Sequence, residues 1–233
     1  MAIILTSGSY MAEGSGRPVV VTLEGEKRNA FTYRLIEKLL GIECKDITVI
    51  TNSGNVFSSG LDLSVFLQGR DAVLEYLFRI HRLVKKLLSC EGRLIAVVNG
   101  DVYGFGVEFL YFMDYVVAAK RDYKFSLQGV NLGVFPPYTA AVGRRLFAPA
   151  HLRVVLNREF TAEEAFHFGI VSQVGDLELK KLFSPPAYVA EVVSHRRWLV
   201  SFVDEAIPVF YKLAEVATRE ETVKRLREFF KKS

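Results

Sequence analysis

The chain has 233 residues, of which 50% are hydrophobic and 24% charged, a composition that suits one well-cored globular domain and excludes a disordered or fibrous chain. Its first residues lack the basic segment and long apolar run of a secretory signal, so the sequence predicts a cytoplasmic protein. The net charge of +4 favours anionic partners, but no basic stripe is interleaved with stacking aromatics, which argues against nucleic acid.

Short β-branched runs alternate with helical patterns along the first part of the chain. The pattern predicts strands at 19–23, 47–50, 94–98 and 115–119. It also predicts a helix at 33–40 and a second one through the apolar spacing between positions 74 and 88. Strands that alternate with helices indicate a layered α/β fold.

The later third of the sequence favours helices. Residues 161–164 (T-A-E-E) and 218–221 (T-R-E-E) match the capping-box pattern that opens a helix, and Gly169 would close the first of the two. Pro185 and Pro186 would start a further helix. The sequence therefore predicts an α/β core at 1–180 and a C-terminal helical region at 181–233.

The most apolar stretch, residues 94–119, is long enough to span a bilayer. It contains Asp101, Glu108 and Asp114, which are expensive in hydrocarbon. We therefore predict a buried core with a site embedded in it, and no membrane span.

The other residues that often carry chemistry form no evident site. Cys44 and Cys90 are predicted to form no disulfide framework, and they lack metal-ligand spacing. His81 falls on the apolar face of a predicted helix, which is typical of a core histidine with satisfied hydrogen bonds, and His167 is predicted to be structural or exposed. The sequence indicates neither a hydrolase triad nor a metal site.

Two segments that contain glycines, 54–63 and 98–108, directly follow predicted strands. Glycine lets the backbone turn sharply and approach a ligand without a Cβ in the way. Where such a loop runs into a helix, unpaired amides favour negative charge. Each loop alone indicates only a tight turn, because the second lacks the third glycine of a dinucleotide fingerprint and no Walker lysine follows either one.

Taken together and in order, these motifs resemble those of the crotonase (enoyl-CoA hydratase/isomerase) family. F-S-S-G-L-D-L at 57–63 resembles the family's F-x-x-G-x-D-L/I loop. The segment 98–114 is similar to V-x-G-x-x-x-G-x-G-x-E followed by an aspartate. K-R-N-A-F at 27–31, F-x-x-x-x-x-x-L-G-x-x-P at 125–136 and A-x-E-A-x-x-x-G-I-V within 161–174 complete the order. The resemblance covers residues 17 to 175.

The resemblance implies an α/β fold built as a spiral of β-β-α turns, with a helical C-terminal region that packs trimers, often paired into hexamers. It implies an acyl-CoA thioester as the partner and no cofactor beyond the coenzyme A of the substrate. It also implies that two backbone N–H groups, those of Leu61 and Phe105, stabilise an enolate-like thioester oxygen.

The resemblance also implies contacts with substrate and coenzyme A around the same loops. The residues concerned are Lys27, Arg28, Ala30, Ser59, Gly60, Leu61, Asp62, Gly104 and Phe105. The carbonyl of Ser59 would meet the adenine, and residues 27–28 either line the nucleotide or form a solvated turn. A lysine common in the family is replaced by Ser64, so phosphate contacts would come from elsewhere, such as residues 231–232 of a neighbouring subunit.

Glu108 aligns with the first of two glutamates that hold and activate water in the family's hydratases, and its apolar neighbours favour a raised pKa. The alternative is an acid that only complements a helix dipole. The position of the second glutamate is Gly129. Three functions therefore stay open: a hydratase- or isomerase-like lyase that uses Glu108 as acid/base, another crotonase reaction such as decarboxylation or thioester hydrolysis, and an acyl-CoA-binding protein with little turnover.

Overall fold

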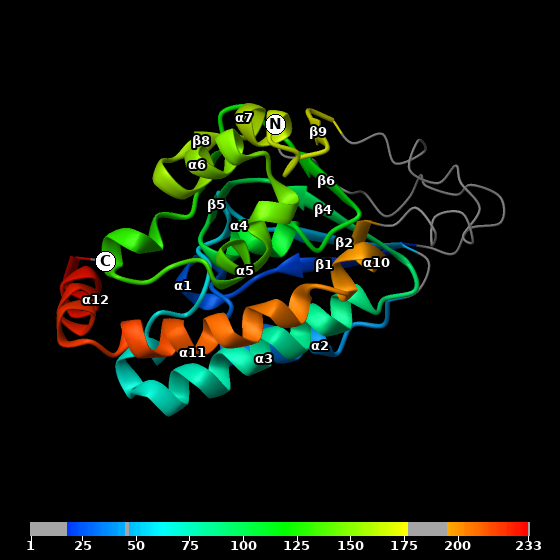
Figure 1. Cartoon of the computed structure of the whole chain (residues 1–233). Coiled ribbons are helices and arrows are strands. Elements are labelled where there is room, and N and C mark those ends of the chain that lie inside the picture. Colours follow the sequence, from blue (N-terminus) through cyan, green and yellow to red (C-terminus); the bar gives the residue numbers. More distant parts are fainter. Residues whose placement is uncertain (1–17, 45–46, 177–194, 233) are drawn as a thin grey trace, which may run out of the picture.

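The computed structural model of the chain describes residues 18–44, 47–176 and 195–232 (Figure 1). Their strands form two sheets, one with the order β1-β2-β4-β6-β9 and one with the order β3-β5-β7-β8. The first sheet consists of β1 (Val19–Leu23), β2 (Ile47–Asn52), β4 (Arg93–Val98), β6 (Tyr115–Ala118) and β9 (Gln173–Val174). The second consists of β3 (Val56–Ser58), β5 (Asp101–Tyr103), β7 (Lys124–Ser126) and β8 (Phe160–Thr161). All pairs are parallel except β7 with β8.

Successive turns of the chain give one strand to each sheet. β2 is followed by β3, β4 by β5 and β6 by β7. The three turns lead into α3 (Arg70–Leu88), α4 (Phe105–Leu110) and α5 (Pro137–Leu146). This arrangement is the ββα spiral that the motifs imply, so the predicted α/β fold is confirmed.

The central strands owe their place to nearly continuous apolar sequence. Every residue of β2 is buried, and so is every residue of β4 after Arg93. Interior strands of parallel sheets are covered on both faces and therefore lack the polar alternation of half-exposed strands. All four predicted strands are present.

The helix predicted from the apolar spacing between positions 74 and 88 is α3. Its buried face repeats every three or four residues, as expected for an amphipathic helix. It packs against α2 (Tyr33–Leu40) and α11 (Ala206–Ala217), and Figure 1 shows α11 lying along α3. Among the helices that the structure describes, none has both the length and the apolar character needed to cross a bilayer.

The remaining helices complete the described chain. They are α1 (Glu26–Asn29), η1 (Val65–Gln68), η2 (Gln128–Leu132), α6 (Pro149–Asn157), α7 (Ala162–His167), α10 (His195–Val200), η3 (Val203–Glu205) and α12 (Glu220–Lys232). The capping box at Thr161 is confirmed. The one predicted at Thr218 is wrong: Thr218 is the C-cap of α11, its hydroxyl donates to the Ala214 carbonyl at 2.9 Å, and α12 begins only at Glu220. The helix predicted from Pro185 and Pro186 lies outside the described residues.

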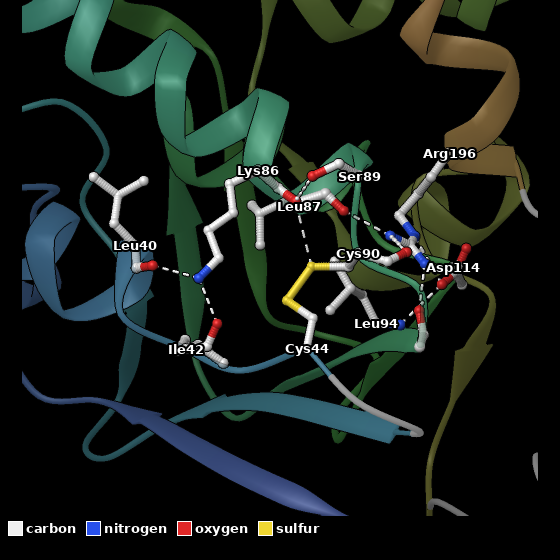
Figure 2. Close-up of a disulfide and its surroundings, with 11 residues drawn as sticks. Leu40, Ile42, Cys44, Lys86, Leu87, Ser89, Cys90, Leu94, Asp114 and Arg196 are labelled. Carbon is white, nitrogen blue, oxygen red and sulfur yellow. Dashed lines mark hydrogen bonds and ion pairs between the residues drawn. A yellow bond between two sulfur atoms is a disulfide. The ribbon is translucent and has the colours of Figure 1, made fainter.

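The prediction that Cys44 and Cys90 form no disulfide is wrong. The two residues are bonded, with their Cα atoms 5.3 Å apart (Figure 2). Cys44 follows α2 and Cys90 follows α3, and these two helices pack against each other. The two cysteines are 46 residues apart in sequence, so no local pattern indicates the bond; the packing of the two helices brings them together.

Next to the disulfide, Arg196 of α10 joins the C-terminal helices to the core (Figure 2). Its side chain is only 3% exposed and donates to the carboxylate of Asp114 at 2.8 Å. It also donates to the carbonyls of Leu87, Cys90 and Gly92. A buried charge is tolerated when it is paired and hydrogen-bonded in this way.

Candidate active site

A left-handed turn at residues 27–29 begins the site. Their φ angles are 53°, 59° and 60°, which non-glycine residues adopt only when surrounding contacts hold them. The buried side chain of Asn29 donates to the Val56 carbonyl at 2.9 Å, and the carbonyl of Arg28 accepts from Ser59 N–H at 3.0 Å. The turn is thereby attached to the loop that follows β3.

The two glycine loops meet at Gly60. A Cβ on Gly60, whose φ is +93°, would lie 2.8 Å from the Tyr103 carbonyl and 2.9 Å from the Phe105 nitrogen. Only glycine allows this approach. Among the hydrogen bonds between described residues, the N–H groups of Leu61 and Phe105 donate to no protein acceptor. The site thus brings together two backbone donors from different turns of the spiral.

A mostly apolar cavity of about 340 Å³ lies beside these two amides. It is lined by Arg28, Ser59, Leu61, Leu63, Tyr103, Gly104, Phe105, Glu108, Ser126, Leu127, Gly129, Leu132, Val134, Phe135, Pro136, Pro137, Glu159 and Phe229. Phe229 belongs to α12, so the C-terminal region contributes to the wall. The volume and the apolar walls suit part of a small organic ligand.

Glu108 belongs to the cavity wall, and its side chain is fully buried. Its Oε1 accepts from the backbone N–H of Thr139 at 2.6 Å and from the Thr139 hydroxyl at 2.9 Å. Its Oε2 has no hydrogen-bond partner. Burial raises the pKa of Glu108 from 4.5 to about 8, although the hydrogen bonds from Thr139 and, to a smaller extent, the nearby backbone of Tyr138 oppose the rise. The carboxyl is therefore largely protonated at pH 7.

Thr139 lies in the first turns of α5 and also contacts a phenol. The hydroxyl of Tyr111 is 3.2 Å from the Thr139 hydroxyl, and both residues are buried. Burial holds the pKa of Tyr111 well above its usual range, so Tyr111 keeps its proton. A chain of hydrogen bonds thus runs from Tyr111 through Thr139 to Glu108.

The cavity has no carboxyl at the position where the resemblance implies a second glutamate. Gly129, in η2, lines the cavity there, and a Cβ on it would lie 3.2 Å from a methyl of Val134. The other carboxylate in the lining is that of Glu159, whose side chain is 42% exposed and whose Oε1 lies 3.3 Å from the ammonium of Lys124. Glu108 is therefore the only buried acid in the lining.

Residues 19–232 match the family model described as enoyl-CoA hydratase/isomerase. The chain belongs to this family. A carnitinyl-CoA dehydratase from Salmonella enteritidis PT4 is 26% identical over 171 residues, covering 69% of this chain and 65% of that relative, which is just under two thirds of its length.

Solved structures agree on the fold. An enoyl-CoA hydratase from Bacillus halodurans superposes with a TM-score of 0.78 at 19% identity, covering 93% of this chain and 98% of that one. An enoyl-CoA hydratase from Mycobacterium avium gives a TM-score of 0.77 at 19% identity, covering 92% and 91%. At 19% identity, these superpositions establish that this chain and the two hydratases share one fold.

Of the ten site residues predicted from the sequence of this chain, six line the cavity. They are Arg28, Ser59, Leu61, Gly104, Phe105 and Glu108. Lys27, Ala30, Gly60 and Asp62 are not part of that lining. The ammonium of Lys27 donates to Asp62 at 2.8 Å and to Ser64 at 2.8 Å, so its charge is already paired.

His81 is a core histidine, as predicted. It is 6% exposed, with Nδ1 3.2 Å from the Tyr138 hydroxyl and Nε2 2.9 Å from Asp204. Burial lowers the pKa of His81, so the neutral ring donates from Nε2 and accepts the Tyr138 proton at Nδ1. Tyr138 faces this histidine and is not part of the cavity lining.

Several residues of the site were missed from the sequence. Thr139 and Tyr111 lie 31 and 3 positions from Glu108, and no motif marks either of them. Phe229 comes from the last helix, beyond the part of the chain covered by the resemblance. The helical spacing of Tyr111 from Glu108 was the one available signal.

Proposed function

We propose that the protein is an enoyl-CoA hydratase-like lyase for acyl-CoA thioesters. Its oxyanion hole consists of the Leu61 and Phe105 amides, and Glu108 is its acid/base. One observation carries the proposal: a fully buried carboxyl with an unpartnered oxygen belongs to the same cavity wall as two backbone amides that donate to no protein acceptor. Such donors, aimed at the developing enolate oxygen, stabilise the transition state by about 3 kcal/mol each.

In the hydration direction, ionised Glu108 accepts a proton at Oε2 from water while the water oxygen bonds to the β-carbon. The C=C electrons move to the thioester oxygen, where the two amides hold the negative charge. The same proton then passes from Oε2 to the α-carbon as the enolate collapses. One carboxyl serves for both transfers because Oε1 is already bonded to Thr139 and Gly129 supplies no second acid.

Coenzyme A is proposed to extend from the thioester past Ser59 towards the exposed Arg28, with no further cofactor. The guanidinium of Arg28 lies over the Tyr103 ring at 5.7 Å, at the cavity wall, and forms no ion pair with a carboxylate in the part of the chain that the structure describes. The charge of Lys27 is paired with Asp62, so Arg28 is the better candidate for a phosphate contact. Assembly as a homotrimer or hexamer remains part of the proposal, and light scattering after gel filtration tests it.

The test follows crotonyl-CoA and a 3-enoyl-CoA with wild type, Glu108→Gln and Glu159→Gln. We expect wild type to hydrate crotonyl-CoA and Glu108→Gln to be at least about 100-fold slower. Glu159→Gln is the matched control, since it removes a solvent-exposed carboxylate from the same cavity. Equal rates for wild type and Glu108→Gln remove Glu108 from the mechanism.

Decarboxylation is a second candidate, favoured by the protonated state of Glu108 and by Gly129. Loss of CO₂ from a malonyl-type thioester leaves the C–C electrons on the enolate, so no base is needed. Neutral Glu108 then gives its proton to the α-carbon. The two reactions differ in pH dependence, because hydration needs the carboxylate and accelerates as pH rises towards about 8, whereas decarboxylation needs the acid and slows above it.

A panel of acyl-CoAs, with malonyl-CoA and 3-enoyl-CoA included, separates these outcomes. Binding of coenzyme A esters, measured by calorimetry, without conversion of any of them refutes both reactions and leaves an acyl-CoA-binding protein. Absence of binding refutes the acyl-CoA assignment itself.

A further inference from the structure

The two oxygens of Glu108 are in different situations. Oε1 accepts two hydrogen bonds, both from Thr139, while Oε2 accepts none. A carboxyl oxygen that already accepts two donors is a poor place for a proton, since the proton would face the hydrogens of both donors. When Glu108 is neutral, its proton is therefore on Oε2.

The direction of the hydrogen bonds behind Glu108 follows from the number of available protons. A threonine hydroxyl has one hydrogen, and Thr139 gives it to Glu108. The Thr139 oxygen must then accept from Tyr111, whose phenol stays protonated. Donation from Tyr111 polarises the Thr139 hydroxyl and strengthens its bond to Oε1.

We propose that Thr139 is a positioning residue which, backed by Tyr111, holds Oε1 of Glu108 and thereby confines the transferable proton to Oε2. The proposal rests on the proposed role of Glu108 as the acid/base. The role belongs to the Thr139 hydroxyl and not to the backbone of α5. A substitution at this position can remove the hydroxyl while the Thr139 N–H stays bonded to Oε1. The hydroxyl also favours the charged form of Glu108 and so keeps the carboxylate accessible.

The titratable groups that face Glu108 are both phenols. Tyr111 is the C-cap residue of α4, the helix that carries Glu108, and Tyr138 is on α5; burial keeps the pKa of each well above its usual range. His81 and Asp204 lie behind Tyr138, where they bond to each other. No charged side chain contributes to the pKa of Glu108, so the Thr139 hydroxyl is its main adjustable contact.

The test measures the proton on Glu108 directly, by the infrared carbonyl stretch of its protonated carboxyl across a pH series, with Glu108→Gln identifying the band. Thr139→Val keeps the side-chain shape and removes the hydroxyl, and we expect the pKa of Glu108 to rise by about 1 to 2 pH units. Thr139→Ser restores the hydroxyl and should return the titration to that of wild type. Tyr111→Phe should raise the pKa by less than Thr139→Val does.

The matched control is Thr48→Val, which removes a buried hydroxyl with no partner, in β2 and outside the cavity lining. It should leave the titration of Glu108 unchanged. Should valine at position 139 prevent folding, Thr139→Ala and Tyr111→Phe carry the same test. A titration in Thr139→Val that coincides with wild type, or one in Thr139→Ser that moves as far as in Thr139→Val, overturns the proposal.

Activity is measured separately, so that the two proposals can fail independently. If the infrared titration moves as expected but no acyl-CoA is converted, the positioning of the proton stands and the proposed reaction fails. If acyl-CoA is converted, the pH–rate profile should move with the infrared titration in each variant. A rate profile that stays fixed while the titration moves refutes the link between Thr139 and the reaction.

Discussion

The buried carboxyl of Glu108 should make the stability of the protein fall as pH rises. Its pKa is raised from 4.5 to about 8 in the folded state, so the folded protein holds this proton more tightly than the unfolded chain does. The contribution of this bound proton to the free energy of unfolding is complete below pH 4.5 and is lost as pH rises through 8. The full difference corresponds to about 5 kcal/mol, of which about 3 kcal/mol is already lost at pH 7.

The variant that tests this is Glu108→Gln, which has no titrating group. Its amide oxygen can accept the Thr139 bonds, while its amide NH₂ takes the place of the unpartnered Oε2. That buried donor destabilises the variant by about 1–3 kcal/mol at every pH, so the comparison rests on the slope and not on the absolute stability.

The assay is urea unfolding followed by circular dichroism from pH 5 to pH 9, at one protein concentration because association would add to the apparent stability. From pH 5 to pH 9 the unfolding free energy of wild type should fall by about 4 kcal/mol more than that of Glu108→Gln. The control is Glu159→Gln, which removes a solvent-exposed carboxylate from the same cavity. Parallel stability curves for wild type and Glu108→Gln would refute the claim that Glu108 is protonated in the folded protein.

Three further outcomes follow from packing and covalent structure. Replacing Cys44 and Cys90 by serine should lower the unfolding free energy by about 4 kcal/mol, because the bond closes a segment of 46 residues in the unfolded chain; unfolding with and without reductant checks it, and an unchanged midpoint contradicts it. Thr48→Val should leave stability unchanged or raise it by about 1 kcal/mol because its buried hydroxyl has no partner, whereas Thr51→Val should lower it because that hydroxyl donates to the Val97 carbonyl; denaturation midpoints that move together would contradict this. Gly60→Ala should abolish acyl-CoA binding measured by calorimetry, since its Cβ would displace the loops that carry both amides, and retained affinity would show that their spacing does not matter.

The sequence was sufficient for the fold because strands and helices follow local patterns. β2 and β4 are continuous apolar runs, and α3 has a clean amphipathic spacing. The ordered motifs then placed Gly60 and Phe105 in one site, and the structure brings them so close that a Cβ on Gly60 would lie 2.9 Å from the Phe105 nitrogen. Patterns of this kind depend only on neighbours along the chain, and in a natural protein these local preferences agree with the overall fold.

The contacts that were missed depend on how distant segments pack. The disulfide requires the ends of α2 and α3 to meet, which no spacing between Cys44 and Cys90 can indicate. The capping pattern at Thr218 was overridden because α11 continues to Ala217 and takes Thr218 as its C-cap, with the hydroxyl bonded back to the Ala214 carbonyl. The pairing of Lys27 with Asp62 likewise follows from the left-handed turn at residues 27–29, which the sequence alone does not specify.

The hydrogen bonding of Glu108 argues against a purely structural role. A buried acid kept for stability would have both oxygens bonded, because each unsatisfied polar atom lowers stability. Glu108 instead has one oxygen held by Thr139 and one left without a partner in a cavity wall, beside the amides of Leu61 and Phe105. At neutral pH, ordinary packing would favour glutamine or leucine at this position. An unpartnered Oε2 that exchanges a proton with bound substrate would explain why only one of the two oxygens is hydrogen-bonded within the protein.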